Sequence, residues 1–572
     1  MRIRIFTAAI AFFLIAGARL QAQTPDSTRF SCDGRLVTGI EVESHPPAIV
    51  GDDPSTLRRA VKHAVFQSGT TRESTIRSFL RARVGDRCSD RWLAEVARVV
   101  RAQPYLASVT VRTASDGTDG VRLIVETIDE VPLILGGGYR KGSLSNIKYG
   151  NENIAGTGLS ASSTWRDGRA YRDGLALSLR QYGLFDRPLV ASLDVNRDPV
   201  GGQFSAAITQ PFLSDLQHIA WYAGGTQSTS YRGFVRTGGP DLSLPITRDV
   251  WALGGVARYS WRGASLLIGP LATYEQSRPD SSGVIVASSG LLPADTSILA
   301  GRYASYRAFR AGGAIGLRVL DYLHVQGFDA LLGEQDVARG VQLAMTAQRA
   351  LSGTAGMGGS TLLTFDVYSG AGTANSFSAL RIEGDGLAGA SGQAWSAATL
   401  SGRGAWYHKT SNFSVFQASM EFSGGWRERL PLQLSLGETP SGVRGYDGTP
   451  IAGGRRAVLR LEQRRTLFAT GPLAQWGGAL FTDIGKTWSG DVPFGQTTVA
   501  RGSVGVSLLA AVPPKSRRML RADIAVPVTG GAAKRWVLRF SSTDATRQFW
   551  RDPSDLAATR AGMPASPIFG WP

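Results

Sequence analysis

Short segments that alternate apolar and polar residues recur from about residue 133 onward, and they limit the fold more than any other feature. The segment Leu189–Asn196 places its apolar residues on one face, and Leu520–Val526 places Arg521 and Asp523 opposite its apolar face. A period of two predicts β-strands with one apolar and one polar face. Both a transmembrane β-barrel and a soluble β-sandwich are built from such strands.

Aromatic residues and segment spacing favour the barrel. Twelve of the thirteen tryptophans lie after residue 133. Trp and Tyr also recur near the ends of the alternating segments, as the interface girdles of a barrel require. About 400 residues, at about 25 per strand and connection, predict roughly 16 antiparallel strands. We therefore predict an all-β transmembrane barrel over residues 133–542. No apolar run after the N-terminal segment is long enough for a transmembrane helix.

The first 22 residues have the layout of a secretory signal peptide. Arg2 and Arg4 precede the apolar stretch Ile5–Ala16, and small residues follow it. A membrane anchor is the alternative, although the apolar stretch is short for one. Export is also what an outer-membrane barrel requires.

The chain has two cysteines, Cys32 and Cys88. In an exported protein, two cysteines in an oxidising compartment are expected to form one disulfide. The alternative is two free thiols that the fold holds too far apart.

Residues 24–132 predict a separate α+β unit ahead of the barrel. A strand over 37–43 is followed by a helix over 71–80, with Thr71 as its candidate N-cap. Asp90 is the candidate cap of a second helix, which Pro104 ends. Two further strands, near residues 109–112 and 121–126, complete the order strand, helix, helix, strand, strand.

Charge and motifs argue against nucleic-acid binding and enzymatic activity. The formal net charge is +17, but the basic residues are spread over strands and loops instead of forming a basic arm. Arginines suit a polar lumen and loops that face lipid phosphates, although a generally basic surface explains them equally well. The five histidines are scattered, and no nucleophile elbow or metal-binding spacing occurs. We expect no enzyme, no cofactor, no metal and no nucleic-acid partner.

A loop arginine and two carboxylates form the strongest candidate site. Val443-Arg444-Gly445-Tyr446 precedes Glu462 and Asp483, each of which lies in a segment that reads as a strand. A lone carboxylate in a barrel wall is unfavourable unless water or a cation satisfies it. A long loop that folds inward and carries Arg444 would satisfy both carboxylates. The alternative is that water solvates each charge separately in the lumen.

The chain resembles the outer-membrane assembly-factor superfamily, the group that contains BamA, TamA and the two-partner secretion transporters. Its N-terminal unit is similar to a POTRA domain in element order, in the Gly85-Asp86 turn and in the stretch 105–111. The segments 136–139 and 151–158 look like the family's first barrel strands. The C-terminal match is an ordered set: Leu436-Gly437, Val443–Tyr446, Gly453-Gly454, Glu462, Phe481-x-Asp483-x-Gly485 and Asp523-x-Ala525-x-Pro527.

The resemblance implies a site and a function. Arg444 would lie on the sixth extracellular loop, folded into the lumen, with Glu462 and Asp483 as its acidic partners. The protein would be an outer-membrane insertase or translocase with its POTRA-like domain in the periplasm. Its implied partners are unfolded outer-membrane or secreted polypeptides, outer-membrane lipids and accessory periplasmic proteins. A secretion pore for one dedicated passenger, or a passive porin or surface antigen, are the alternatives.

The chain departs from the family pattern in two places. Only one POTRA-like unit is present, whereas the main assembly proteins carry several and the two-partner transporters carry two. The family usually ends on the last barrel strand, but here residues 543–572 form a tail beyond the segment 536–541, which looks like that strand.

Overall fold

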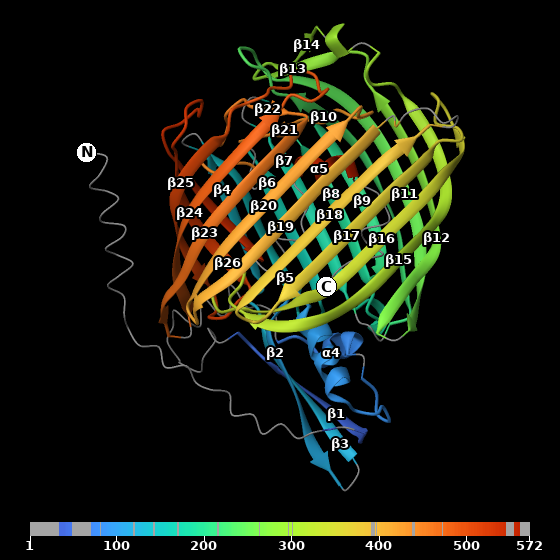
Figure 1. Ribbon diagram of the computed structural model, residues 1–572, viewed down its shortest axis with the longest axis vertical. Helices are drawn as coiled ribbons and strands as arrows, with labels where there is room; N and C mark the ends of the chain where they lie inside the picture. The colour runs from blue at the N-terminus through green and yellow to red at the C-terminus, as the bar shows by residue number, and fades with distance from the viewer. Residues whose placement is uncertain are drawn as a thin grey trace, which may run out of the picture.

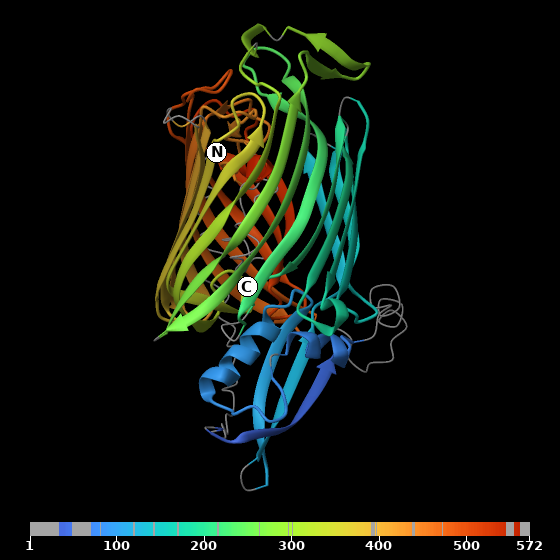
Figure 2. The same cartoon turned by 90° about the vertical axis from the view of Figure 1, so that its right-hand side faces the viewer.

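The computed structural model shows a large β-barrel with a small N-terminal domain beneath it (Figures 1 and 2). We call the barrel end that faces this domain the near rim and the opposite end the far rim. The structure describes residues 32, 34–47, 70–80, 82–117, 120–140, 143–168, 171–198, 200–213, 217–261, 263–295, 297–299, 301–389, 395, 397–437, 441–471, 473–544 and 554–560. The predicted signal peptide, residues 1–22, lies outside the described residues.

Within its described residues, the N-terminal domain has a three-stranded sheet and two helices. Its elements are β1 (Leu36–His45), α3 (Glu73–Phe79), α4 (Asp90–Arg101), β2 (Leu106–Asp116) and β3 (Gly120–Asp129). The central strand β3 pairs in parallel with β1 and antiparallel with β2. An apolar cluster that includes Ile76, Val96, Val100 and Leu123 joins the helices to the sheet.

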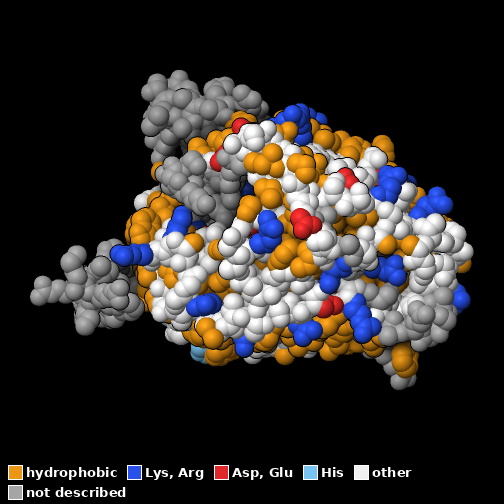
Figure 3. Space-filling model, turned by 90° about the horizontal axis from the view of Figure 1, so that it is seen from above, with side chains coloured by type: hydrophobic (Ala, Val, Ile, Leu, Met, Phe, Trp, Pro, Cys, Tyr) orange, Lys and Arg blue, Asp and Glu red, His pale blue; other side chains and the backbone are white. Residues whose placement is uncertain are grey.

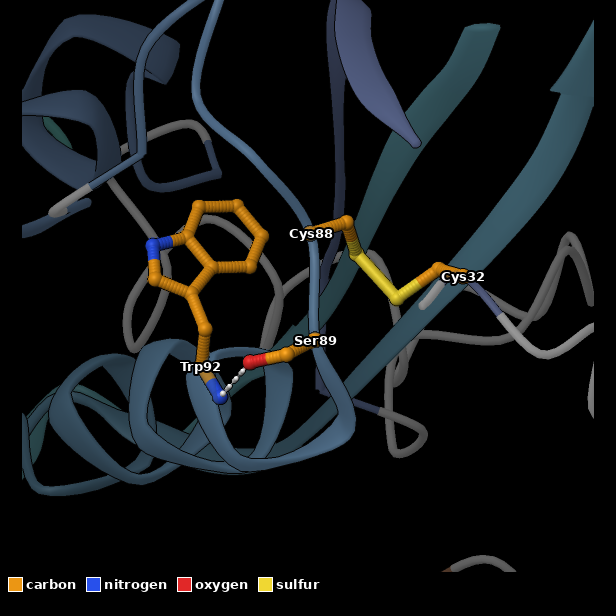
Figure 4. The surroundings of a disulfide bond; sticks show 4 residues. All are labelled: Cys32, Cys88, Ser89 and Trp92. Atoms are coloured by element: carbon orange, nitrogen blue, oxygen red, sulfur yellow. Dashed lines mark hydrogen bonds between the residues drawn. A yellow bond between two sulfur atoms is a disulfide. The ribbon is translucent and has the colours of Figure 1, made fainter. Parts of the chain in front are cut away.

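Both predicted helix caps are wrong in detail. The N-cap of α3 is Arg72, without a side-chain hydrogen bond, because Thr71 instead donates its backbone N–H and its hydroxyl to Asp129. The N-cap of α4 is Ser89, not Asp90. The Ser89 hydroxyl accepts a hydrogen bond from the Trp92 backbone N–H at 3.2 Å (Figure 4).

The structure joins Cys32 and Cys88 in a disulfide (Figure 4). It ties the segment ahead of β1 to the segment that leads into α4, and both cysteines are buried. The two residues are 56 apart in sequence. Closing a loop of that length stabilises the fold by roughly 4 kcal/mol in the chain-entropy description.

Antiparallel strands form the closed barrel. They are β4 (Leu133–Arg140), β5 (Ser143–Ile154), β6 (Leu159–Arg166), β7 (Gly174–Tyr182), β8 (Val190–Asp198), β9 (Gly201–Gln210), β10 (Ile219–Phe234), β11 (Leu242–Trp261), β12 (Ala264–Pro279), β15 (Tyr306–Gln326), β16 (Glu334–Gly353), β17 (Thr361–Gly372), β18 (Ser376–Ala388), β19 (Ala397–Ser411), β20 (Ser414–Trp426), β23 (Arg455–Thr470), β24 (Ala474–Trp488), β25 (Arg501–Ala511), β26 (Arg518–Pro527) and β27 (Val537–Asp544).

Smaller elements lie in the connections. The hairpin β13 (Gly283–Ala287) and β14 (Gly290–Ala294) extends the sheet beyond the far rim, and η3 (Ser297–Leu299) follows it. The short helix η2 (Leu184–Asp186) lies at the near rim. Among the described residues, no helix is long and apolar enough to cross a membrane.

The barrel has about 20 strands within the described residues, so the estimate of roughly 16 is too low. The assumed repeat of about 25 residues suits the long strands, such as β15 with 21 residues. It overestimates the short strands at the two ends of the barrel sequence, since β4 and β27 have only 8 residues each. Most near-rim turns are also short.

The strands present apolar side chains outward and polar side chains to the lumen. In β15, Ile315 and Leu317 are exposed on the outside, whereas Arg310 and Arg318 are buried. Viewed from above, apolar side chains follow much of the barrel outline (Figure 3). This is the side-chain arrangement of a transmembrane barrel.

The N-terminal domain is fastened to the near rim by charged groups. Arg517, in the turn between β25 and β26, donates to the backbone carbonyls of Arg101, Gln103 and Leu106 at 2.6–2.8 Å. The Glu130 carboxylate accepts from the backbone N–H of Arg517 at 3.2 Å. Arg517 thus satisfies carbonyls at the C-terminal end of α4, where a cation is favoured.

A second contact joins the domain to the first barrel hairpin. The Thr71 hydroxyl donates to Asp129 at 2.6 Å and accepts from the Asn153 side chain at 2.7 Å. Burial raises the pKa of Asp129 to about 6, although the hydrogen bonds from Thr71 act in the opposite direction.

Candidate functional site

The connection between β20 and β23 folds into the barrel lumen. Within it, the two-residue strands β21 (Leu434–Ser435) and β22 (Ala452–Gly453) pair with each other and close a loop. We call the described residues of this loop, 436–437 and 441–451, the inner loop. Its apolar side chains, which include Leu436, Val443 and Tyr446, pack on Val458 of the barrel wall.

The inner loop depends on glycine at two points. Gly445 has a φ of +93°, a left-handed conformation that favours glycine. Gly437 lies directly against the backbone carbonyl of Tyr446, where a Cβ atom would overlap it. The Tyr446 hydroxyl then contacts the Thr529 carbonyl at 2.8 Å, beyond the end of β26. These contacts place Arg444 at the inner face of the wall.

Arg444 uses its guanidinium group on two carboxylates. Its Nε and Nη2 atoms donate to the two oxygens of Asp483, each at 2.7 Å, and its backbone N–H donates to Asp483 at 3.1 Å. Its Nη1 atom donates to Glu462 at 3.3 Å. The guanidinium also lies over the Phe481 ring, 3.5 Å from the centroid. The structure therefore brings together all three charged residues that the sequence singled out.

The motif Phe481-x-Asp483-x-Gly485 on β24 has a separate contact for each named residue. Phe481 lies under the guanidinium and Asp483 accepts its hydrogen bonds. Gly485 leaves room for Val443 of the inner loop, because a Cβ atom at Gly485 would overlap that side chain. Alternate residues of one strand thus form a socket for the inner loop.

Glu462 on β23 is the centre of a wider charge network. Besides Arg444, it accepts from Arg521 at 2.6 Å and from Arg464 at 3.2 Å. Arg521 also pairs with Asp523 at 2.6 Å. Three arginines and three carboxylates thus form one compact group, and Arg444, Glu462, Asp483 and Asp523 are each at most 7% exposed.

The network also reaches the near-rim turn between β15 and β16. Arg464 donates to the backbone carbonyls of Phe328 and Asp329, at 3.1 and 2.5 Å. The Asp329 carboxylate in turn accepts from the Tyr407 hydroxyl at 2.6 Å. Glu462 therefore contacts one arginine that holds the inner loop and another that holds an inward-folded turn.

Sequence reasoning missed Arg521 and Arg464 as partners of Glu462. Arg521 and Asp523 share the polar face of their strand pattern, and this indicates that both side chains face the lumen. It did not reveal the partner, because Glu462 lies on β23 and Arg521 lies on β26, and two strands separate them in the sheet. Such a contact can be predicted only from the geometry of the closed barrel, because the strand pattern does not show which side chains meet across the lumen.

Among the described residues, no group of His, Cys, Asp and Glu is arranged to hold a metal ion. The compact charge group around Glu462 has three guanidinium groups and three carboxylates, and these charges pair with one another. What this arrangement can do is hold a loop in one place inside a polar lumen. It supplies no nucleophile with a neighbouring base.

No family profile matches the chain, and no curated protein matches it significantly. Solved structures that it resembles include BamA from Haemophilus ducreyi lacking POTRA domains 1–3, with 12% identity, a TM-score of 0.40 and coverage of 89% of this chain and 85% of that one. CdiB from Escherichia coli has 11% identity, a TM-score of 0.45 and coverage of 94% and 95%. CdiB from Acinetobacter baumannii has 13% identity, a TM-score of 0.40 and coverage of 95% and 96%. With identities this low, function has to be inferred from the chain's own residues.

Proposed function

We propose that this protein belongs to the outer-membrane assembly-factor superfamily and inserts or translocates polypeptides without enzymatic chemistry. The observation that carries the proposal is the inner loop, whose Arg444 is held on Asp483 and Glu462 inside the lumen. A loop that buried ion pairs hold at one place in the lumen favours a working internal element over an open channel. In the proposed orientation the N-terminal domain is a POTRA domain in the periplasm, and the far rim faces the cell exterior.

The N-terminal domain would receive the client polypeptide. Its sheet has the order β1-β3-β2, so β2 is an edge strand. An extended polypeptide can add to such an edge through backbone hydrogen bonds, which gives affinity with little sequence preference. The domain is fastened under the near rim through Arg517 and Glu130, so a client held there lies close to the barrel.

The barrel would open between β27 and β4. These neighbouring strands have 8 residues each, and they are therefore among the shortest in the ring. Separating them breaks fewer hydrogen bonds than separating long strands such as β15 and β16. Unpaired backbone groups are costly in lipid, so an arriving client strand is stabilised by pairing with the opened edge.

The outer surface at this seam fits a lipid-facing opening. A shallow groove crosses it, and its lining includes the apolar side chains Leu135, Leu508, Leu520 and Phe540. Exposed arginines lie in the far-rim loops, and examples are Arg172, Arg302, Arg427 and Arg535. Basic residues at that rim suit the phosphate groups of outer-membrane lipids.

Depletion of the protein followed by comparison of the outer-membrane proteome tests the proposal. We expect the levels of several unrelated barrel proteins to fall, because an insertase serves many clients. Loss of one exported protein alone would assign the chain as a secretion pore for a dedicated passenger. An unchanged proteome, together with high single-channel conductance, would contradict both and favour a porin.

A further inference from the structure

The chain continues beyond the last barrel strand into a helix that contacts the lumen face of the barrel wall. This helix, α5 (Ser554–Arg560), lies within the outline of the barrel in both side views (Figures 1 and 2). Its partners on the wall come from β18, β19 and β23. The proposed insertase function leaves α5 without a role, since β27 and β4 close the ring without it.

Asp555 fixes the first turn of α5 to β23. Its carboxylate accepts from Arg456 Nη1 at 2.6 Å and from Nη2 at 3.3 Å. Arg456 is 1% exposed and also donates to the Ser435 carbonyl at 2.7 Å, at the base of the inner loop. Glu421, at 3.5 Å, is a further carboxylate neighbour of Arg456. Asp555 is therefore closer to this buried guanidinium than Glu421 is.

Arg560 fixes the last turn of α5 to the neighbouring part of the wall. It donates to Asp385 at 3.0 Å and to the Glu383 carbonyl at 3.2 Å, both on β18. It also donates to the Ser401 hydroxyl at 2.9 Å on β19. The acidic first turn of α5 thus contacts an arginine of the wall, and its basic last turn contacts carboxylates of the wall. The charges of α5 are therefore complementary to those of the wall that it contacts.

Burial between the two anchors indicates a fitted contact. Leu556, one residue after Asp555, is fully buried. Ser401 beneath Arg560 is 2% exposed. A helix resting loosely in a water-filled lumen would leave both groups accessible.

We propose that the lumen face of β18, β19 and β23 is a helix-binding seat and that α5 is its occupant, acting as a plug. Seated, α5 reduces the free cross-section of the lumen beside the inner loop. When α5 is displaced, its contacts with Arg456, Asp385 and Ser401 are lost, and these wall groups can contact water or passing polypeptide on that side. The plug does not depend on whether the barrel inserts or secretes its clients.

Cysteine labelling tests whether α5 is what covers the seat. Ser401→Cys places a thiol under Arg560, and the native cysteines do not interfere because they are joined. The probe is a water-soluble, membrane-impermeant maleimide applied to the purified full chain and to a chain that ends at Asp544. We expect labelling to be at least about tenfold faster in the shorter chain, because reaction follows the accessible population.

Ser507→Cys is the matched control. Ser507 lies on β25, is also buried, and accepts a hydrogen bond from Arg521 instead of from the tail. Its labelling should be the same in both chains. If the Ser401→Cys thiol is labelled equally in the two chains, the proposal is overturned. Faster labelling of both introduced thiols shows general loosening of the barrel, which overturns it as well.

Single-channel conductance in planar bilayers tests whether the plug limits passage. The shorter chain should conduct more than the full chain. The pair Asp555→Asn with Arg560→Gln, which removes both anchors, should switch between the two levels. Asp321→Asn, which removes a carboxylate from the exposed pair with Arg339, should conduct like the full chain.

An unchanged conductance on truncation overturns the plug even where the Ser401→Cys thiol becomes reactive, since α5 would then only brace the wall. No client is used in either measurement, so these results are independent of the depletion experiment.

Discussion

At the scale of single residues, Arg444 is placed where only an arginine fits its contacts. Three side-chain nitrogens donate to two carboxylates, while the flat guanidinium covers the Phe481 ring. A lysine ammonium is a compact charge and cannot reproduce this fork. The buried pairs need not add net stability, because desolvation opposes them, but removal of one partner is costly. Their role is to set where the inner loop lies.

We predict that Arg444→Ala impairs function more than it lowers the amount of folded barrel. Leaving Asp483 unpaired costs about 3–5 kcal/mol when it is fully desolvated, and less in a lumen that admits water. The loop should become protease-sensitive while heat-modifiable migration on gels persists. Arg444→Lys should show an intermediate defect in the same two assays.

The carboxylate variants extend this prediction. Asp483→Ala should resemble Arg444→Ala, and the double mutant should be no worse, because the two residues act as one unit. Glu462→Ala should be at least as damaging, because Glu462 contacts three arginines. Additive losses in a complementation assay, or a fully active Arg444→Ala protein, would show that these residues are not partners.

The contact between Asp129 and Thr71 predicts a pH dependence. In the folded protein the pKa of Asp129 is about 6, above the ordinary value of 3.8. The folded state therefore binds the Asp129 proton more tightly than the unfolded state does. Its contribution to stability is therefore largest below pH 4 and falls as the pH rises to about 6. The difference is on the order of 3 kcal/mol, since each pKa unit corresponds to about 1.4 kcal/mol.

Hydrogen exchange of β3 across this pH range measures the effect. Asp129→Asn should abolish the part of the slope that Asp129 causes and should protect β3 more strongly at pH 7. An identical slope in the variant would mean that other carboxylates produce it, with Glu130 as the nearest candidate.

The residue pattern predicted the site better than it predicted the site's surroundings. Arg444, Glu462 and Asp483 stand out because charged residues in or near strand patterns need partners. Phe481 and Gly485 serve the inner loop in ways that sequence alone does not indicate, since ring stacking and close packing depend on where the loop enters. Both helix caps were misplaced by one residue, because Thr71 and Asp90 are good capping residues by type and only the local backbone decides between neighbours.

At the scale of elements, the barrel's strand lengths are uneven, and this matters for the proposed opening. The longest strands, β11, β15 and β16, have 20 or 21 residues, whereas β4 and β27 have 8. A uniform spacing led to an estimate of roughly 16 strands. The strand type itself was predictable, because alternation is preserved in short and long strands alike.

The last strand and the tail should separate in truncation experiments. A chain that ends at Asp544 keeps β27 and should fold, because β27 can still pair with β4 and close the barrel. A chain that ends before Trp536 lacks β27 and should fail to close. Heat-modifiable migration on gels reports closure, and loss of it in the longer of these two truncated chains would mean that residues after Asp544 are needed for the barrel.

At the scale of the whole molecule, charged contacts link the N-terminal domain, the near-rim turns and the inner loop. Arg517 holds the end of α4, and Arg101 of that helix pairs with Asp336 at the start of β16 at 2.6 Å. The inward turn before β16 is in turn held by Arg464, a partner of Glu462. The sequence predicts an N-terminal domain and a barrel. It does not predict the contacts between them, because these involve turns that are far apart along the chain.

Reconstitution tests the central claim most directly. The purified chain is placed in vesicles, an unfolded outer-membrane barrel protein is added, and its folding is followed by heat-modifiable migration. We predict faster folding than in protein-free vesicles, and a rate close to the protein-free rate with Arg444→Ala at equal amounts of folded protein. Equal client folding rates with the intact chain and with empty vesicles would contradict a role in insertion.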